Sequence, residues 1–152
     1  MTIAETQINA IAASLFRAEP FVYYNDIPET ETAGMPDFKK LAEGQIPTMP
    51  PFTISRSIKL TGAGAVSVQI FSKSAKSRYE MYRKVILRGL KKTIKADESN
   101  WIVSEPGNIF CFMDKPYAKS QATEPALAAC FDQAAIFARF NTIAAQVENC
   151  PQ

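Results

Sequence analysis

Two alternating runs joined by a short turn constrain this chain more than any other feature. Residues 52–60 place their apolar side chains on one face, and residues 65–71 alternate in the same way. The segment between them, Thr61-Gly-Ala-Gly64, has the composition of a tight turn. This pattern predicts a β-hairpin. Arg56 falls on the apolar face, where we expect it at a strand edge or beside a carboxylate, with a role in binding as the alternative.

A second strand pair and three helices complete the predicted fold. Residues 100–104 and 108–113 flank a Pro-Gly turn, which is a strong hairpin signal. Helices are predicted at residues 2–18, where Thr2 and Glu5 form a capping-box pattern, at 73–95, and from Thr123 to Val147. We therefore expect an α+β fold in which three helices pack on a mainly antiparallel sheet of about four or five strands.

A long acidic segment separates the first helix from the first hairpin. Residues 20–51 contain six of the ten prolines, and residues 19–50 have six acids against two lysines. Only the segment 36–43 has the pattern of a helical turn. The whole chain is expected to form one domain, 1–152, in the order α, arm, ββ, α, ββ, α. Residues 1–19 would be the N-terminal helix, 20–51 the extended arm and 52–152 the core.

The segment 73–95 has the strongest charge in the chain. It holds nine of the seventeen basic residues and one acid, for a net charge of +8, whereas the whole chain has +2. On a helix its apolar residues form one stripe, and the opposite side gathers five cations: Lys84, Arg88, Lys91, Lys92 and Lys95. Such a ridge is often a solvated face. A concentration this high also suits an acidic partner, either a phosphate backbone or the arm of this or another subunit.

The predicted C-terminal helix is apolar on two sides, and one sheet would cover only one of them. The second stripe and the arm acids are therefore candidate subunit contacts: Ile136, Phe140, Ile143 and Val147, with Glu29, Glu31 and Asp37.

Several kinds of chemistry are disfavoured. The chain has no histidine, which removes the commonest general base and metal ligand. Cys111, Cys130 and Cys150 form no CxxC pair, so we expect reduced thiols, the first two in the core. No phosphate-binding loop or metal-ligand pattern is found in the sequence. We therefore predict no cofactor, no metal, no membrane segment and no small-molecule ligand.

These features favour a non-enzymatic assembly subunit, such as a component of a virus-like particle, with other copies of itself or other proteins as partners. The alternative is a nucleic-acid-binding protein that uses the basic segment 73–95. A third hypothesis is a small enzyme without histidine chemistry, which would need clustered acids or a desolvated lysine. The N-terminus lacks the basic start of a signal peptide, so a cytoplasmic location or an intracellularly assembled particle is expected.

Overall fold

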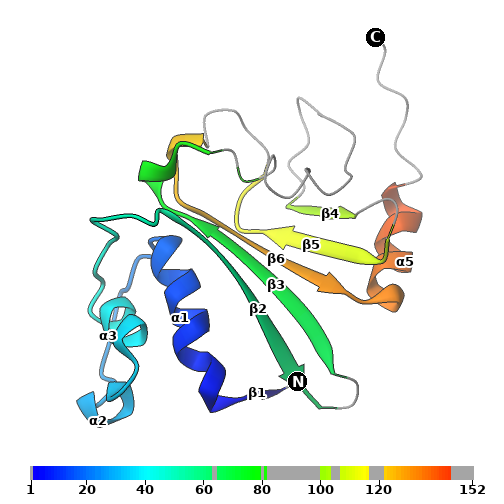
Figure 1. Cartoon of the computed structure of the whole chain (residues 1–152). Coiled ribbons are helices and arrows are strands. Elements are labelled where there is room, and N and C mark those ends of the chain that lie inside the picture. The colour runs from blue at the N-terminus through cyan, green and yellow to red at the C-terminus, as the bar shows by residue number, and fades with distance from the viewer. Residues whose placement is uncertain are drawn as a thin grey trace.

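The computed structural model describes residues 2–62, 65–79, 81, 100–103, 107–116 and 122–144. Within these ranges the chain forms one antiparallel sheet in the order β1-β2-β3-β6-β5-β4 (Figure 1). Its strands are β1 (Thr2–Ile3), β2 (Thr53–Thr61), β3 (Val66–Lys73), β4 (Trp101–Val103), β5 (Ile109–Met113) and β6 (Ala126–Asp132). The expected α+β class is thereby confirmed. The described residues contain six strands and four α-helices, so the predicted numbers of strands and helices were both too low.

The first hairpin forms as the alternation predicts. Ile58 lies opposite Val68, and Leu60 lies opposite Val66, so the apolar residues of β2 and β3 share one face of the sheet. Arg56 is exposed on β2. The second hairpin, β4–β5, is also confirmed, with Ile102 opposite Cys111.

The predicted helix from Thr123 to Val147 is wrong in its first half. Residues 126–132 form β6, which lies between β3 and β5 in the sheet. Ala126, Ala128 and Cys130 face one side of the sheet, and Ala129 belongs to the cluster on the other. A strand covered on both sides has no polar alternation, so its sequence resembles that of a buried helix. Only α5 (Ala134–Ala144) is helical among the described residues of this segment.

The helix predicted at residues 2–18 begins later than expected. Thr2 and Ile3 extend the sheet by pairing with Thr61 and Leu60, and the 3₁₀ turn η1 (Glu5–Gln7) follows. The side chain of Gln7 bonds both the amide and the carbonyl of Lys59, at 2.7 and 2.8 Å. These bonds favour an extended start, and the predicted Thr2 cap is not formed. Helix α1 spans Ile8–Arg17.

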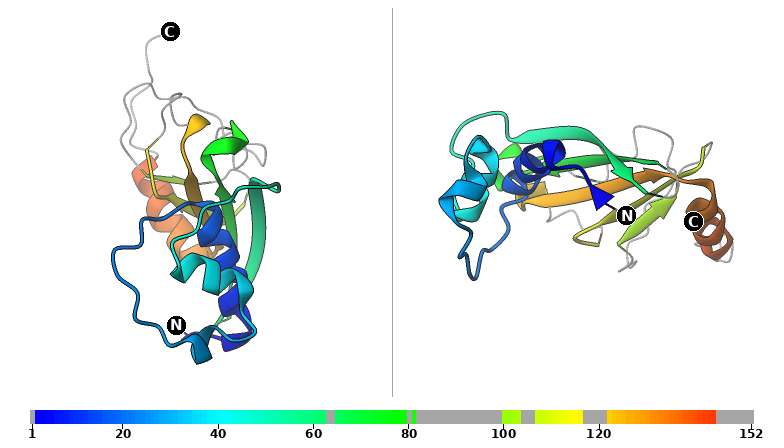
Figure 2. Two further views of the ribbon diagram at one scale, coloured as in Figure 1. Left: turned by 90° about the vertical axis from the view of Figure 1, so that its left-hand side faces the viewer. Right: turned by 90° about the horizontal axis from the view of Figure 1, so that it is seen from below.

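Helix α1 covers one face of the sheet. Ile11 packs against a cluster of buried residues from three strands: Ile58, Leu60, Val66, Val68, Ile70 and Ala129. Two views place α1 and the arm at one end of the molecule and α5 at the other (Figures 1 and 2). At that other end Phe140 of α5 packs 4.2 Å from Phe110 and 5.0 Å from Trp101, measured between ring centroids.

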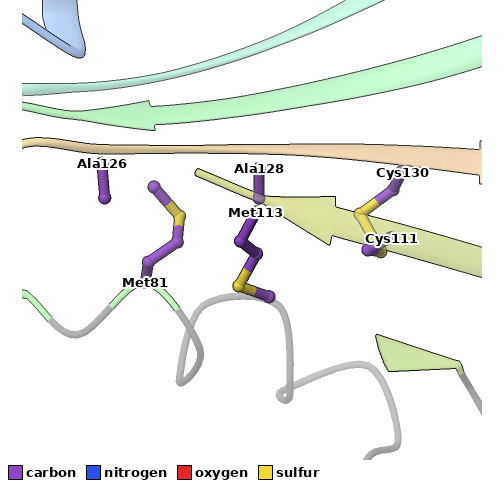
Figure 3. Packing of buried hydrophobic residues seen from close by; sticks show 6 residues of the cluster. All are labelled: Met81, Cys111, Met113, Ala126, Ala128 and Cys130. Carbon is purple, nitrogen blue, oxygen red and sulfur yellow. A yellow bond between two sulfur atoms is a disulfide. The ribbon is translucent and has the colours of Figure 1, made fainter. Parts of the chain in front are cut away.

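A second cluster lies on the opposite face. Its six buried residues are Met81, Cys111, Met113, Ala126, Ala128 and Cys130 (Figure 3). Cys111 and Cys130 are cross-strand partners and form a disulfide. The expectation of reduced thiols at these two positions is therefore wrong. Register decided the outcome, because the two cysteines, 19 residues apart in sequence, lie directly opposite each other on β5 and β6.

The acidic arm is ordered against α1 by two short helices, α2 (Glu29–Thr32) and α3 (Pro36–Ala42). The predicted helical turn near residue 36 is thus confirmed. The side-chain oxygen of Asn9 in α1 accepts hydrogen bonds from the amides of Asp37 and Phe38, which joins the start of α3 to α1. None of the helices in the described part of the chain is long and apolar enough to cross a membrane.

Candidate functional site

The candidate residues from sequence that the structure describes lie on the arm helices and on α5. Lys84, Arg88, Lys91, Lys92, Lys95 and Val147 lie outside the described residues. Glu29 and Asp37 pair with lysines of the arm itself, Lys39 at 3.7 Å and Lys40 at 3.6 Å, and Glu31 is exposed on α2. Proposed contacts of these acids with the basic segment remain a prediction.

The C-terminal stripe does not form one continuous surface. Phe140 packs inside the chain, Ile136 is half-buried, and Ile143 is 54 % exposed. Leu127 and Phe131, from the other stripe of the predicted helix, lie in β6. The reason for expecting a neighbouring subunit at a doubly apolar helix is therefore removed, and an interface at these residues stays untested.

A different group of side chains gathers where three strands meet. The C-terminal ends of β3 and β5 lie beside the N-terminal end of β6, because each strand is antiparallel to β6 (Figure 1). Four side chains with electrostatic interactions gather there, and we call them the strand-end cluster: Lys73, Asp114, Lys115 and Glu124. They come from the last residue of β3, the two residues after β5 and the turn before β6.

Lys73 is the buried member of the strand-end cluster. It is 2 % exposed, and its ammonium group donates a hydrogen bond of 2.9 Å to the carbonyl of Ala122. Burial lowers the pKa of Lys73 below its ordinary 10.5, and the charge of Lys115 lowers it further. Glu124, Glu19 and Asp114 oppose that change. Lys73 is thus a desolvated lysine surrounded by carboxylates, which is the arrangement that an enzyme without histidine would need.

Asp114 is the most exposed member of the strand-end cluster. The residue is exposed, and its Oδ1 atom accepts a hydrogen bond of 2.9 Å from the amide of Leu127. Partial desolvation of the carboxyl raises the pKa of Asp114 above 3.8, against the lowering effects of the Leu127 amide, Lys115 and Lys73. An accessible carboxyl with a raised pKa is suited to proton transfer.

Lys115 and Glu124 form the remaining pair. Their Nζ and Oε2 atoms lie 2.8 Å apart, and the side chain of Lys115 is 32 % exposed. This exposure leaves the ammonium group within reach of a bound anion. The two serines that flank Lys73 are also buried, and the hydroxyl of Ser72 has no hydrogen-bond partner among the described residues. A buried hydroxyl without a partner costs about 1–3 kcal/mol, so this end of β3 is not arranged for stability alone.

Backbone strain is found beside the same cluster. Among the described residues only Glu19, at φ 51°, and Arg78, at φ 53°, are non-glycine residues with positive φ. The charge of Glu19 raises the pKa of Lys73, and Arg78 follows Lys73 by five residues in the sequence. Strained residues of this kind concentrate at functional sites. Both residues with positive φ are therefore associated with this end of the sheet.

Sequence reasoning missed the strand-end cluster. The sequence pattern predicted Lys73 as the first residue of a helix 73–95, but it is the last residue of β3, and Ala75–Ser77 form a 3₁₀ turn. One signal was available: continuing the alternation of the expected strand 65–71 by two residues places Lys73 on the same face as Phe71. Its carboxylate neighbours come from other strands, and the sequence did not reveal that proximity.

Comparison with known protein families gives a match over most of the chain. The family model described as Deoxyribonuclease II matches residues 1–97 of the 152, a range that includes β1, α1, the arm and the first hairpin. Asp114, Lys115 and Glu124 lie beyond the matched range. No curated protein and no solved structure matches the chain.

The family match corrects the leading hypothesis. A non-enzymatic assembly subunit and a virus-particle component were expected, and both expectations are wrong, because the match indicates a nuclease. Charge patterning had suggested a partner of opposite sign and favoured protein over nucleic acid. The same pattern suits an enzyme whose substrate is a polyanion.

Proposed function

This chain belongs to the deoxyribonuclease II family, and we propose that it hydrolyses DNA at the strand-end cluster. The family match is the observation that supports DNA as the substrate and hydrolysis as the reaction. The cluster supplies what phosphodiester hydrolysis requires of a protein without histidine, namely cations for the phosphate charge and a carboxyl for proton transfer.

We assign the general acid to Asp114. Water adds to phosphorus, the bond from phosphorus to one sugar oxygen breaks, and that oxygen takes the proton of the Asp114 carboxyl. The water loses its own proton to solvent, from which Asp114 is protonated again. The raised pKa of Asp114 increases the fraction of the acid form, and the half-buried Lys115 neutralises charge on the phosphate.

Lys73 acts as a positioning residue. At 2 % exposure it is too buried to touch a substrate, but its charge lowers the pKa of Asp114, and its hydrogen bond holds Ala122 in the turn before β6. Replacing Lys73 by Met removes a positive charge near Asp114. The pKa of Asp114 should then rise, and the pH at which activity falls should move upward.

The test is cleavage of supercoiled plasmid and linear duplex by the full chain across acidic to neutral pH, with EDTA in one series and Mg²⁺ in another. Asp114→Asn should lower the cleavage rate about 100-fold or more, which corresponds to about 3 kcal/mol of transition-state stabilisation. The matched control is Asp132→Asn, which changes an exposed carboxylate at the opposite end of β6 and should leave the rate unchanged.

Two results would contradict this assignment. Absence of cleavage by the unmodified chain at every pH, with and without Mg²⁺, would remove the proposed activity. Equal rates for Asp114→Asn and Asp132→Asn would keep the activity but reject Asp114 as the acid. For Lys73→Met the decisive measurement is the pH profile, since a purely structural role would lower the rate without shifting the pH dependence.

A further inference from the structure

The turn that follows Lys73 presents an unusual pair of side chains. After β3 the chain forms the short 3₁₀ turn η2 (Ala75–Ser77), then Arg78 and Tyr79. Ser74 anchors this turn: its amide donates to the carbonyl of Phe52 at 2.9 Å, and its hydroxyl accepts from the amide of Lys76 at 3.2 Å. The turn is therefore held at the same end of the sheet as the strand-end cluster.

The ammonium group of Lys76 makes its contacts within the protein. Its ammonium group donates to the carbonyl of Pro47 at 3.2 Å and lies 5.8 Å from the centre of the Phe52 ring. These contacts tie the turn to the arm. After the half-buried Ser77, two side chains face solvent: Arg78 is exposed, and Tyr79 is 65 % exposed. Among the described residues, no carboxylate pairs with Arg78.

Arg78 has a conformation that arginine rarely adopts. Its φ of 53° and ψ of 18° fall in the left-handed region, where glycine or asparagine is favoured. A functional role of the side chain would explain why arginine occupies this strained position. A guanidinium binds phosphate through two hydrogen bonds, and an exposed aromatic ring stacks on an unpaired base.

We propose that Arg78 and Tyr79 form a binding site for single-stranded DNA, in which Arg78 holds a backbone phosphate and Tyr79 stacks on a base. This site rests on the proposed nuclease function and deepens it, since it names the form of the substrate. Bases in an intact duplex are covered by their neighbours, so only a single strand, a frayed end or a locally opened segment offers a face to Tyr79.

The experiment measures equilibrium binding by fluorescence anisotropy, in the Asp114→Asn background to prevent turnover. The probes are a labelled oligothymidylate of about 12 nucleotides, a length within the usual range for a single-strand site, and a labelled duplex of equal length. Tyr79→Ala should weaken single-strand binding roughly 5- to 100-fold, which is the usual range for loss of one stacked base. Tyr79→Phe keeps the ring and should restore the affinity.

Arg78 is tested by a substitution that suits its backbone. Arg78→Gly removes the guanidinium and relieves the left-handed strain, so a loss of binding in this variant is not attributable to unfolding. Affinity for both probes should fall, and the slope of log K against log salt for the single strand should decrease by about 0.7. Arg78→Lys should retain that slope. Tyr23→Ala, which removes an 89 % exposed tyrosine of the arm, is the matched control and should change nothing.

The outcomes separate this site from the nuclease function. If Tyr79→Ala leaves single-strand affinity unchanged, or lowers single-strand and duplex affinity by the same factor, the stacking site is rejected even when the unmodified chain cleaves DNA. If the chain discriminates single strands through Tyr79 but cleaves nothing at any pH, the site stands as a binding site and the proposed hydrolysis fails.

Discussion

The two ends of strand β3 differ sharply, although both lie between β2 and β6. At its start, Val66, Val68 and Ile70 are buried under α1 and make only apolar contacts within their cluster. At its end, Ser72, Lys73 and Ser74 are each at most 2 % exposed, yet all three are polar. Burying apolar surface stabilises a fold, whereas burying polar groups costs free energy unless every group is paired. The first half of β3 therefore supports the fold, and the polar second half contributes Lys73 to the proposed site.

The largest stability effect is expected in the apolar half. Ile70→Ala removes a side chain that is 7 % exposed in the α1 cluster, and it should lower the free energy of unfolding by about 2–5 kcal/mol. Urea denaturation followed by circular dichroism gives this value. Ile46→Ala, at a residue that is 57 % exposed, should change it by less than about 0.5 kcal/mol. Equal effects at the two positions would show that the α1 face is not the core.

The disulfide reinforces the other face of the same sheet. Replacing both Cys111 and Cys130 by Ala should lower the free energy of unfolding by about 3 kcal/mol, because the cross-link closes a loop of 19 residues. Reductant should destabilise the unmodified chain by a similar amount and leave the double variant unaffected. A reductant effect in both proteins would place the stabilisation elsewhere. Disulfides are typical of oxidising compartments, whereas the cytoplasmic location expected from sequence stays a prediction.

The polar half of β3 should behave in the opposite way. Lys73→Met removes a buried charge and one hydrogen bond to Ala122 while keeping most of the side-chain volume. Loss of the desolvation cost and loss of the hydrogen bond offset each other, so the free energy of unfolding should change by less than about 1 kcal/mol. A loss as large as that for Ile70→Ala would mean that the two halves of β3 do not differ in the way described.

The pH dependence of stability sharpens the same contrast. The folded-state pKa of Lys73 is lowered from 10.5, so between its folded and unfolded pKa values the unfolded chain binds more protons. Stability linked to Lys73 is therefore gained as the pH rises through that window and is complete above 10.5. Against Lys73→Met, the unmodified chain should gain relative stability in alkaline solution. A relative loss there would reverse the sign and reject a desolvated lysine.

The smallest effect is expected in the arm. Glu29 pairs with Lys39 at 3.7 Å, but the Glu29 side chain is 91 % exposed, so solvent screens the interaction. Glu29→Ala should change the free energy of unfolding by less than about 0.5 kcal/mol. A larger change would show that arm charges, which the sequence pattern had made prominent, matter more than the buried groups of β3.

Sequence reasoning succeeded where the periodicity of one segment decides its structure. Both hairpins, the helical turn near Pro36 and the α+β class were predictable, because alternation and turn residues act locally. It failed at β6, where a strand buried on both faces has the apolar continuity of a helix. It failed again at the candidate site, where the only local sign was a lysine two residues after Phe71.

Local alternation and turn residues therefore determined the two hairpins of this protein before any packing was known. Tertiary structure alone decided that β6 lies between β3 and β5, and the proposed site depends on that arrangement. Placing β6 between β3 and β5 put Cys130 opposite Cys111, and it brought Asp114, Lys115 and Glu124 to the buried ammonium of Lys73. Charge interactions and cross-links depend on distances in space, and separations along a chain do not specify those distances.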